Sequence, residues 1–158
     1  MNTPNPEHVE RLISSVNASP YFQLLNMRVM EMGVGYAVVG IDLARQHLQP
    51  FGIVHGGVLA SLIESVTSWA IFYEIKDESA GVTTVDLKLN YLAPATSGKA
   101  IARGRSIKLG RTLAYAEASV TKEGGEILAR GSSTLMILAG KAPHMDQPSP
   151  PKFVYESV

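Results

Sequence analysis

The stretch that decides the fold is residues 50–72, PFGIVHGGVLASLIESVTSWAIF. It predicts a long helix, roughly Gly56 to Ile75, which the chain enters through two glycines. Because this helix is apolar on nearly all sides, it is typical of a helix buried in a protein core. Its serines and threonine, the lack of flanking Lys or Arg, and a length below the ~20 residues that a bilayer needs argue against a membrane span.

Length and composition limit the class of protein. The chain has 158 residues, which suits one domain with one core. Fourteen basic and fourteen acidic residues cancel, so no overall field favours nucleic acid or an anionic membrane as a partner. The chain has no cysteine, which excludes disulfides, thiolate nucleophiles and cysteine-bound metals. The N-terminal sequence MNTPNPEHVERL lacks the pattern of a secretory signal, and we expect a cytoplasmic protein.

Alternating apolar and polar residues predict strands on both sides of the long helix. Residues 28–43 are interpreted as a hairpin, preceded by a short helix at 7–16 and a tight turn at 19–26. In TTVDLKLNYL the alternation places Thr84 and Asp86 together on the polar side of their strand. We interpret the last four strands as an antiparallel meander, at 83–92, 99–108, 111–121 and 126–138.

The three last strands each carry a row of small residues at alternate positions. Because side chains alternate across a strand, these rows can line one face of the sheet and form a trough for a bulky apolar helix. The sequence therefore predicts an α+β fold, with a curved antiparallel sheet wrapped around one long central helix. We expect a single domain over residues 1–140 and a proline-rich C-terminal tail over 141–158. The rows are Ala100, Ala102 and Gly104; Ala114, Ala116 and Ala118; Ala129, Gly131 and Ser133.

Glu64 is the one charged residue between 56 and 73. Burying an unpaired carboxylate is costly, so such a group finds a partner or a raised pKa. The hydroxyls of Thr67 and Ser68, three and four residues on, lie on the same helical face. Glu64 is thus either a structural residue, with a hydrogen-bond partner in the core or at a subunit interface, or a functional residue.

The entry to the helix suggests chemistry for that group. Glycines at His55-Gly56-Gly57 let a ligand approach backbone N–H groups that the first helical turn leaves unpaired, at the positive end of the helix dipole. A carbonyl oxygen placed there would be polarised, although plain loop geometry also explains a glycine pair. Since Glu64 lies about 12 Å from Gly56 along the helix, both can act on one carbon only if they come from two copies with antiparallel central helices.

These residues, in this order, resemble the hotdog-fold acyl-CoA thioesterases over roughly residues 20–139. The resemblance is closest to the 4-hydroxybenzoyl-CoA and phenylacetyl-CoA thioesterase branches. It rests on HGG at 55–57, a carboxylate nine positions after the histidine at Glu64, and the strand end Tyr91-Leu92-Ala93-Pro94. It implies a five- or six-stranded sheet around the helix, and assembly into homodimers and homotetramers that are dimers of dimers.

The resemblance also implies roles for individual residues. Glu64 would be the nucleophile or the general base for water, and the Gly56 amide would polarise the carbonyl. Gln49 would lie near the thioester, and Ser68 would orient the glutamate or a water. The resemblance implies acyl-CoA as the substrate, with coenzyme A a part of it rather than a cofactor. Substrate contacts are further implied for His55, Gly57, Thr84, Arg111 and Thr112.

Each of these residues has a plainer interpretation. Gln49 can satisfy loop backbone, Ser68 can bond to its own helix, and Arg111 can belong to a solvated hairpin end. Trp69, Phe72 and Tyr73 either line an acyl pocket or fill the core. His8, His47 and His144 have no metal-ligand spacing, and we expect no metal.

Three functions follow from this sequence. The leading hypothesis is hydrolysis of an acyl-CoA thioester to a free acid and coenzyme A. The alternatives are hydration or dehydration of an enoyl thioester on the same fold, and non-catalytic binding of acyl-CoA or lipid. The sequence leaves open the acyl group, which can be aromatic, medium-chain or branched.

Overall fold

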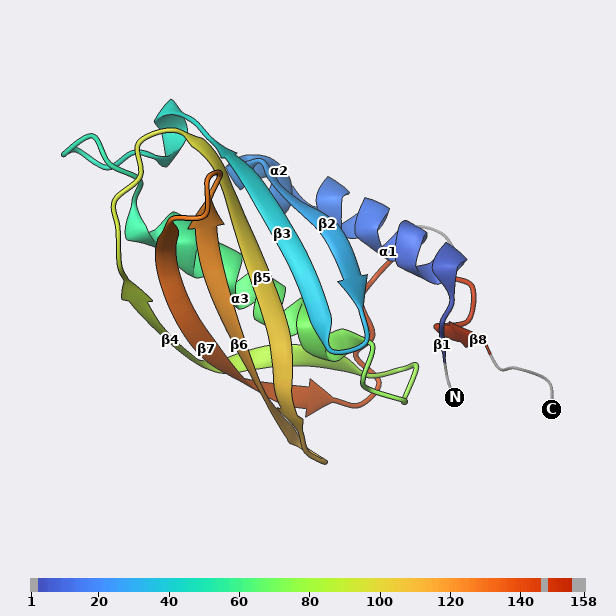
Figure 1. The fold of residues 1–158 in the computed structure, drawn as a ribbon. Helices are drawn as coiled ribbons and strands as arrows, with labels where there is room; N and C mark the ends of the chain where they lie inside the picture. The colour runs from blue at the N-terminus through green and yellow to red at the C-terminus, as the bar shows by residue number, and fades with distance from the viewer. Residues whose placement is uncertain (1–2, 146–147, 155–158) are drawn as a thin grey trace.

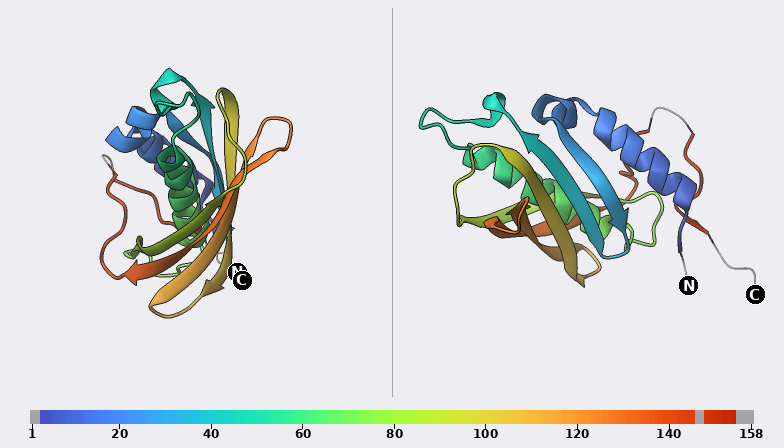
Figure 2. Two further views of the ribbon diagram at one scale, coloured as in Figure 1. Left: turned by 90° about the vertical axis from the view of Figure 1, so that its left-hand side faces the viewer. Right: turned by 45° about the horizontal axis from the view of Figure 1, so that its top comes forward.

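The computed structural model describes residues 3–145 and 148–154 (Figure 1). A six-stranded antiparallel sheet in the order β2-β3-β5-β6-β7-β4 curves around the helix α3, Gly56–Phe72. Figure 2 shows α3 in the concave side of the sheet, which confirms the predicted hotdog architecture. The strands are β2 (Met27–Gly33), β3 (Tyr36–Leu43), β4 (Gly81–Tyr91), β5 (Gly98–Leu109), β6 (Leu113–Lys122) and β7 (Ile127–Leu138).

Two further helices precede the sheet, and a 3-10 turn, η1 (Arg45–His47), follows β3. The helix α1, Pro6–Ala18, begins at Asn5, whose side chain accepts a hydrogen bond from the Glu7 amide. The segment predicted as a tight turn is instead a short helix, α2, Pro20–Leu25. Pro20 fits the first helical position, and Asn26 ends the helix in the left-handed conformation, with a φ of 55°.

The strand order corrects the predicted meander. β5, β6 and β7 are consecutive neighbours, but β4 pairs with β7 and forms an edge of the sheet. The place beside β5 is taken by β3. After β4 the chain therefore crosses the end of the sheet through residues 92–97, a connection that alternation within single strands does not encode.

The predicted trough is confirmed by the contacts of α3. The alanines of the three small rows are buried against the helix. A Cβ atom added to Gly104 would lie 2.6 Å from the carbonyl oxygen of Val66 in α3. A larger side chain there would push the helix off the sheet, so the small residues set how closely the two elements approach.

A β-bulge interrupts the alternation of β4. Its register against β7 shifts between Thr84, which is opposite Leu135, and Asp86, which is opposite Thr134. Val85 is the additional residue and is exposed, while Thr84 is half-buried on the side of α3. Bulges re-aim side chains in this way, so the expectation that Thr84 and Asp86 share one face is wrong.

The C-terminal tail returns to the body of the protein. Its strand β8, Phe153–Val154, pairs with β1, Thr3–Pro4, in a separate two-stranded sheet. Residues 146, 147 and 155–158 of the predicted tail lie outside the described residues. Next to β8, the buried Lys152 donates hydrogen bonds from Nζ to the carbonyl oxygens of Phe72 (2.8 Å) and Ile75 (2.9 Å). The tail thus satisfies carbonyl groups at the C-terminal end of α3.

Aromatic residues surround this lysine. Nζ of Lys152 lies 3.9 Å from the ring centroid of Phe72, and the hydroxyl of Tyr73 lies 2.7 Å from Nδ1 of His8. Phe72 and Tyr73 are buried and Trp69 is half-buried against Phe72, so Phe72 and Tyr73 fill the core. No helix formed by the described residues is long and apolar enough to cross a membrane.

Burial lowers the pKa of Lys152 to about 8, although the carboxylates of Glu78 and Asp77 favour its charged form. Between pH 8 and about 10, the unfolded chain therefore keeps a proton that the folded chain has released, and stability rises with pH. We predict that the free energy of unfolding of wild type, relative to Lys152→Met, increases by on the order of 1 kcal/mol from pH 7.5 to 9.5.

Urea unfolding at the two pH values measures this difference. The control is Lys141→Met, which changes an exposed lysine of the same tail and should leave the pH dependence as in wild type. A difference between wild type and Lys152→Met that is the same at both pH values would contradict the prediction.

Candidate active site

Glu64 lies in the middle of α3 and is half-buried. Its Oε1 accepts a hydrogen bond of 2.6 Å from the hydroxyl of Thr84 on β4. The bulge after Thr84 makes this contact possible, because it aims the threonine at the helix. The structure thus pairs two residues that the resemblance connected with the site, and the partner of the carboxylate comes from the sheet rather than from the helix.

The helical hydroxyls near Glu64 have other partners. Ser68 donates to the backbone carbonyl of Glu64 at 3.0 Å. Thr67 lies 2.7 Å from the hydroxyl of Ser133 on β7 and also donates to helix carbonyls. Ser68 is therefore close to the carboxylate in sequence but bonds to its own helix, and Thr67 joins the helix to the sheet.

The first turn of α3 offers an unused donor. His55 is the N-cap, and its Nδ1 accepts a hydrogen bond of 2.8 Å from the Gly57 amide. His55 therefore shapes this turn. Among the described residues, none accepts a hydrogen bond from the Gly56 amide, which points out of the positive end of a 17-residue helix.

A cleft of about 460 Å³ opens beside this amide. Gly56, Gln49 and Tyr91 line it together with apolar side chains that include Ile53 and Leu59. The Gln49 side chain accepts a hydrogen bond of 2.5 Å from the Phe51 amide, so it also orders the loop. That loop projects from the body of the protein (Figure 1), and Phe51 within it is 90% exposed. The cleft thus combines apolar walls with a few polar groups, as small-molecule sites do.

The two parts of the candidate site lie at different ends of the chain's own sheet. Gly56 contacts Tyr91 near the C-terminal end of β4, whereas Glu64 meets Thr84 near its N-terminal end. Glu64 is eight positions after Gly56 in the helix, which is about 12 Å along the axis. One chain therefore presents an amide and a carboxylate that do not converge on a single atom.

Arg111 and Thr112 lie in the exposed turn between β5 and β6. The carbonyl oxygen of Thr112 accepts a hydrogen bond from the Ile137 amide. Ala114, two residues after Thr112, is opposite Leu135 on β7, and Leu135 is opposite Thr84 on β4. The turn is therefore at the Thr84 end of the sheet, remote from Gly56.

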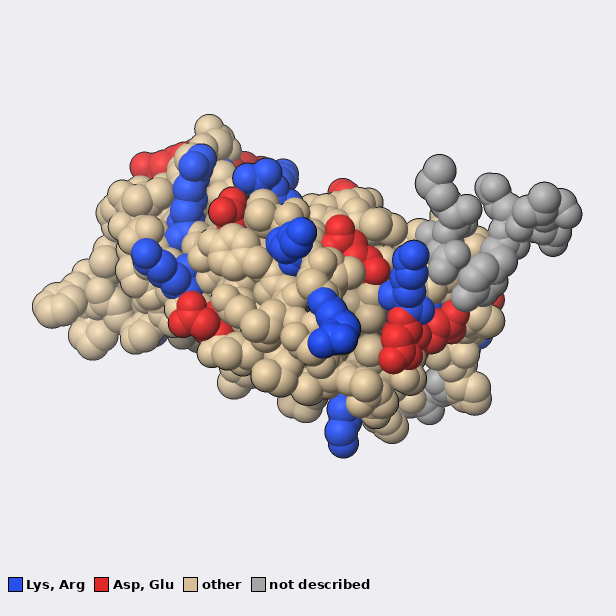
Figure 3. Space-filling model, turned by 90° about the horizontal axis from the view of Figure 1, so that it is seen from below, with Lys and Arg blue, Asp and Glu red and all other residues tan. Residues whose placement is uncertain are grey.

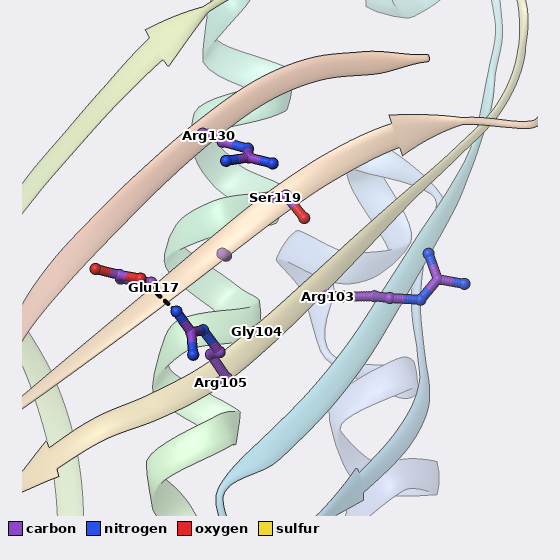
Figure 4. A pocket seen from close by; sticks show the side chains of 7 residues that line it. Arg103, Gly104, Arg105, Glu117, Ser119 and Arg130 are labelled. Atoms are coloured by element: carbon purple, nitrogen blue, oxygen red, sulfur yellow. Dashed lines mark hydrogen bonds and ion pairs between the residues drawn. The ribbon is translucent and has the colours of Figure 1, made fainter. Parts of the chain in front are cut away.

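The opposite, outer face of the sheet has a separate hollow of about 300 Å³ with three arginines around it (Figure 4). Arg105 pairs with Glu117 at 3.1 Å, and Arg103 donates a hydrogen bond of 3.5 Å to the hydroxyl of Thr121 on β6 (Figure 4). These cations do not converge on one point, and the sheet separates them from Glu64. On the side of the protein seen in Figure 3, basic and acidic residues are likewise interspersed.

Sequence reasoning missed two features of this site. One is the bulge that turns Thr84 toward Glu64, for which the alternation of apolar and polar residues carries no signal. The other is Tyr91, which belongs to the motif at the end of its strand and lies against Gly56. Among residues 3–145 and 148–154, no group of three or more His, Asp and Glu residues could hold a metal ion.

Comparison with known proteins identifies the family of this chain. The Thioesterase superfamily profile matches residues 51–129. Acyl-coenzyme A thioesterase 13 of Mus musculus is 29% identical over 133 residues, which are 83% of this chain and 84% of the mouse protein. The crystal structure of a thioesterase from Haemophilus influenzae is 25% identical and superposes with a TM-score of 0.78 over 88% of this chain and 96% of that one.

A third comparison concerns the fold alone. The PaaI protein of E. coli, from the phenylacetic acid degradation operon, is 16% identical and has a TM-score of 0.77 over 87% of this chain and 97% of its own. The superfamily match covers α3, both residues of the Glu64–Thr84 pair and the amide at Gly56. The chain therefore belongs to the thioesterase superfamily and is an enzyme of the thioester hydrolase class.

Proposed function

We propose that this enzyme hydrolyses an acyl-CoA thioester to a free acid and coenzyme A, with Glu64 as the attacking or water-activating carboxylate. The observation that supports this role is the hydrogen bond of 2.6 Å between Thr84 and Glu64. It holds a half-buried carboxylate in one orientation and leaves its second oxygen for water or the substrate carbonyl. The mouse thioesterase named above supports acyl-CoA as the substrate class.

The Gly56 amide supplies the second requirement of thioester hydrolysis. Attack on a thioester places negative charge on the carbonyl oxygen, and a fixed N–H donor at a helix N-terminus stabilises that charge. Gly56 is suited to this because its amide has no acceptor among the described residues. The adjacent cleft can hold the thioester next to it.

The reaction needs the carboxylate of one chain and the amide of another. Because the two groups of one chain are about 12 Å apart, a two-fold dimer with antiparallel α3 helices brings Gly56 of one copy to Glu64 of its partner. The edge strand β4 carries exposed apolar residues, among them Val85 and Tyr91, and such an edge is suited to pairing with a second copy. Two such dimers would form the tetramer.

The rest of coenzyme A would extend to local cations. With no net charge on the chain, the nucleotide phosphates need nearby donors, and Arg111 and Thr112 are exposed at the Thr84 end of the sheet. Gln49 would assist at the carbonyl after its bond to Phe51 is exchanged for the substrate, and Ser68 would orient the attacking water after a rotation.

The direct test is release of free coenzyme A from a panel of aromatic and aliphatic acyl-CoAs. We expect Glu64→Gln to lose at least about a thousandfold in kcat while still binding acyl-CoA, because the amide cannot attack or accept a proton. Equal rates for the two proteins would mean that Glu64 is structural. Loss of an enoyl chromophore without thiol release would indicate a hydratase, and binding without either signal would indicate a non-catalytic protein.

Replacement of Gly56 by proline tests the amide. Proline is tolerated at the first helical position, and the extended backbone of His55, with a ψ of 133°, is compatible with a following proline. We expect Gly56→Pro to lower kcat about a hundredfold relative to Gly56→Ala. The alanine variant is the control because it also adds a Cβ near Tyr91 but keeps the N–H. Equal kcat values would show that the amide is not used.

Removal of the Thr84 hydroxyl tests how Glu64 is held. We expect Thr84→Val to lower kcat about tenfold with little change in KM, since the carboxylate loses a charge-assisted hydrogen bond that orients it. Thr83→Val, at an exposed position of the same strand, should behave as wild type. Steady-state kinetics of both variants measures this, and full activity of Thr84→Val would contradict the proposed role of the hydrogen bond.

A further inference from the structure

Tyr91 lies against Gly56 in a way that core packing does not require. A Cβ atom added to Gly56 would be 2.8 Å from both Cζ and the hydroxyl oxygen of Tyr91. The tyrosine is nevertheless 56% exposed and lines the cleft beside the helix. Among the described residues, none forms a hydrogen bond with its hydroxyl. The phenol is thus a free donor at the mouth of the cleft.

The hydroxyl is close enough to the Gly56 amide to share an acceptor with it. In standard geometry a Cβ atom is roughly 2.5 Å from the nitrogen of its own residue. The Tyr91 hydroxyl oxygen therefore lies at most about 5.3 Å from the Gly56 nitrogen, whereas two donors that are each about 2.9 Å from one oxygen can be up to about 5.8 Å apart. A single oxygen atom can accept hydrogen bonds from both groups.

The Tyr91 hydroxyl also lies on the side of Gly56 that faces the N-terminal end of α3. The Cα–Cβ bond of a helical residue tilts toward the helix N-terminus, and the free N–H groups of the first turn point the same way. Tyr91 occupies the place of the missing Gly56 side chain. The phenol therefore stands next to the path along which a ligand oxygen would approach the amide.

We propose that the Tyr91 hydroxyl is a second donor to the thioester carbonyl oxygen, beside the Gly56 amide. This inference rests on the proposed thioesterase function and adds a catalytic residue to it. As the tetrahedral intermediate forms, the electron pair of the C=O bond moves to the oxygen, and the two donors stabilise the charge. Tyr91 keeps its proton, and none of its covalent bonds forms or breaks.

The arrangement also gives a reason for glycine at position 56. A side chain there would occupy the space of the Tyr91 hydroxyl and displace it. Gly56→Ala should therefore lose the contribution of Tyr91 while it keeps its own amide. The absence of a side chain at position 56 thus leaves room for the phenol and also lets a ligand reach the backbone amide.

Two measurements test the proposal, and the matched control is Tyr115→Phe on the outer face of the sheet, where Tyr115 faces away from α3. In steady-state thiol release, we expect Tyr91→Phe to lower kcat tenfold to about a hundredfold with little change in KM. Tyr115→Phe should match wild type. An unchanged kcat in Tyr91→Phe would overturn the proposal.

The second measurement does not depend on turnover. Benzoyl-CoA labelled with ¹³C at its carbonyl is bound to Glu64→Gln and to Glu64→Gln/Tyr91→Phe, and the carbonyl stretching frequency is recorded by infrared difference spectroscopy. We expect a shift to lower frequency in the single variant and a clearly smaller shift in the double variant. Equal shifts would overturn the role of Tyr91, whereas an absence of thiol release by wild type from every acyl-CoA would overturn the thioesterase function itself.

Discussion

The close contact between α3 and the sheet is the constraint on which the rest of the structure depends. Gly104 lies so near Val66 that a Cβ atom would be 2.6 Å from its carbonyl oxygen. Small residues on three strands give the helix this space, and the curvature of the sheet follows the helix. Because α3 is held so firmly, the groups that it carries have fixed positions. They are an amide at its first residue, which has no acceptor in the described part of the chain, and a carboxylate about two turns later.

The sheet in turn supplies the residues that contact the carboxylate and the amide. An edge strand with a bulge supplies Thr84 to Glu64, and the same strand supplies Tyr91 to Gly56. β4 thus serves both ends of the candidate site, although the two ends are far apart within one chain. At the other end of the helix, Lys152 binds the carbonyls of Phe72 and Ile75, so a residue near the C-terminus stabilises the element that carries the proposed catalytic groups.

Sequence patterns predicted the parts of this structure that repeat with a regular period. The apolar helix and the small faces of three strands were sufficient for the wrapped architecture, because burial imposes both patterns. The place of β4 was not predictable in this way, since strand order depends on pairing across the sheet. The partner of Glu64 was missed for a related reason: a one-residue bulge reverses the side on which Thr84 lies. Tyr91 carried no signal of its own, because its proposed role depends on the missing side chain of Gly56.

The central claim is that one active site takes Glu64 from one chain and Gly56 from another. It is tested most directly by co-expressing Glu64→Gln and Gly56→Pro chains with different affinity tags and measuring thiol release by the purified mixed dimers. A shared site predicts that each mixed dimer contains one intact site and one with both defects, so its activity returns to about half that of wild type although each parent is inactive. Mixed dimers no more active than the two parents would contradict the shared site.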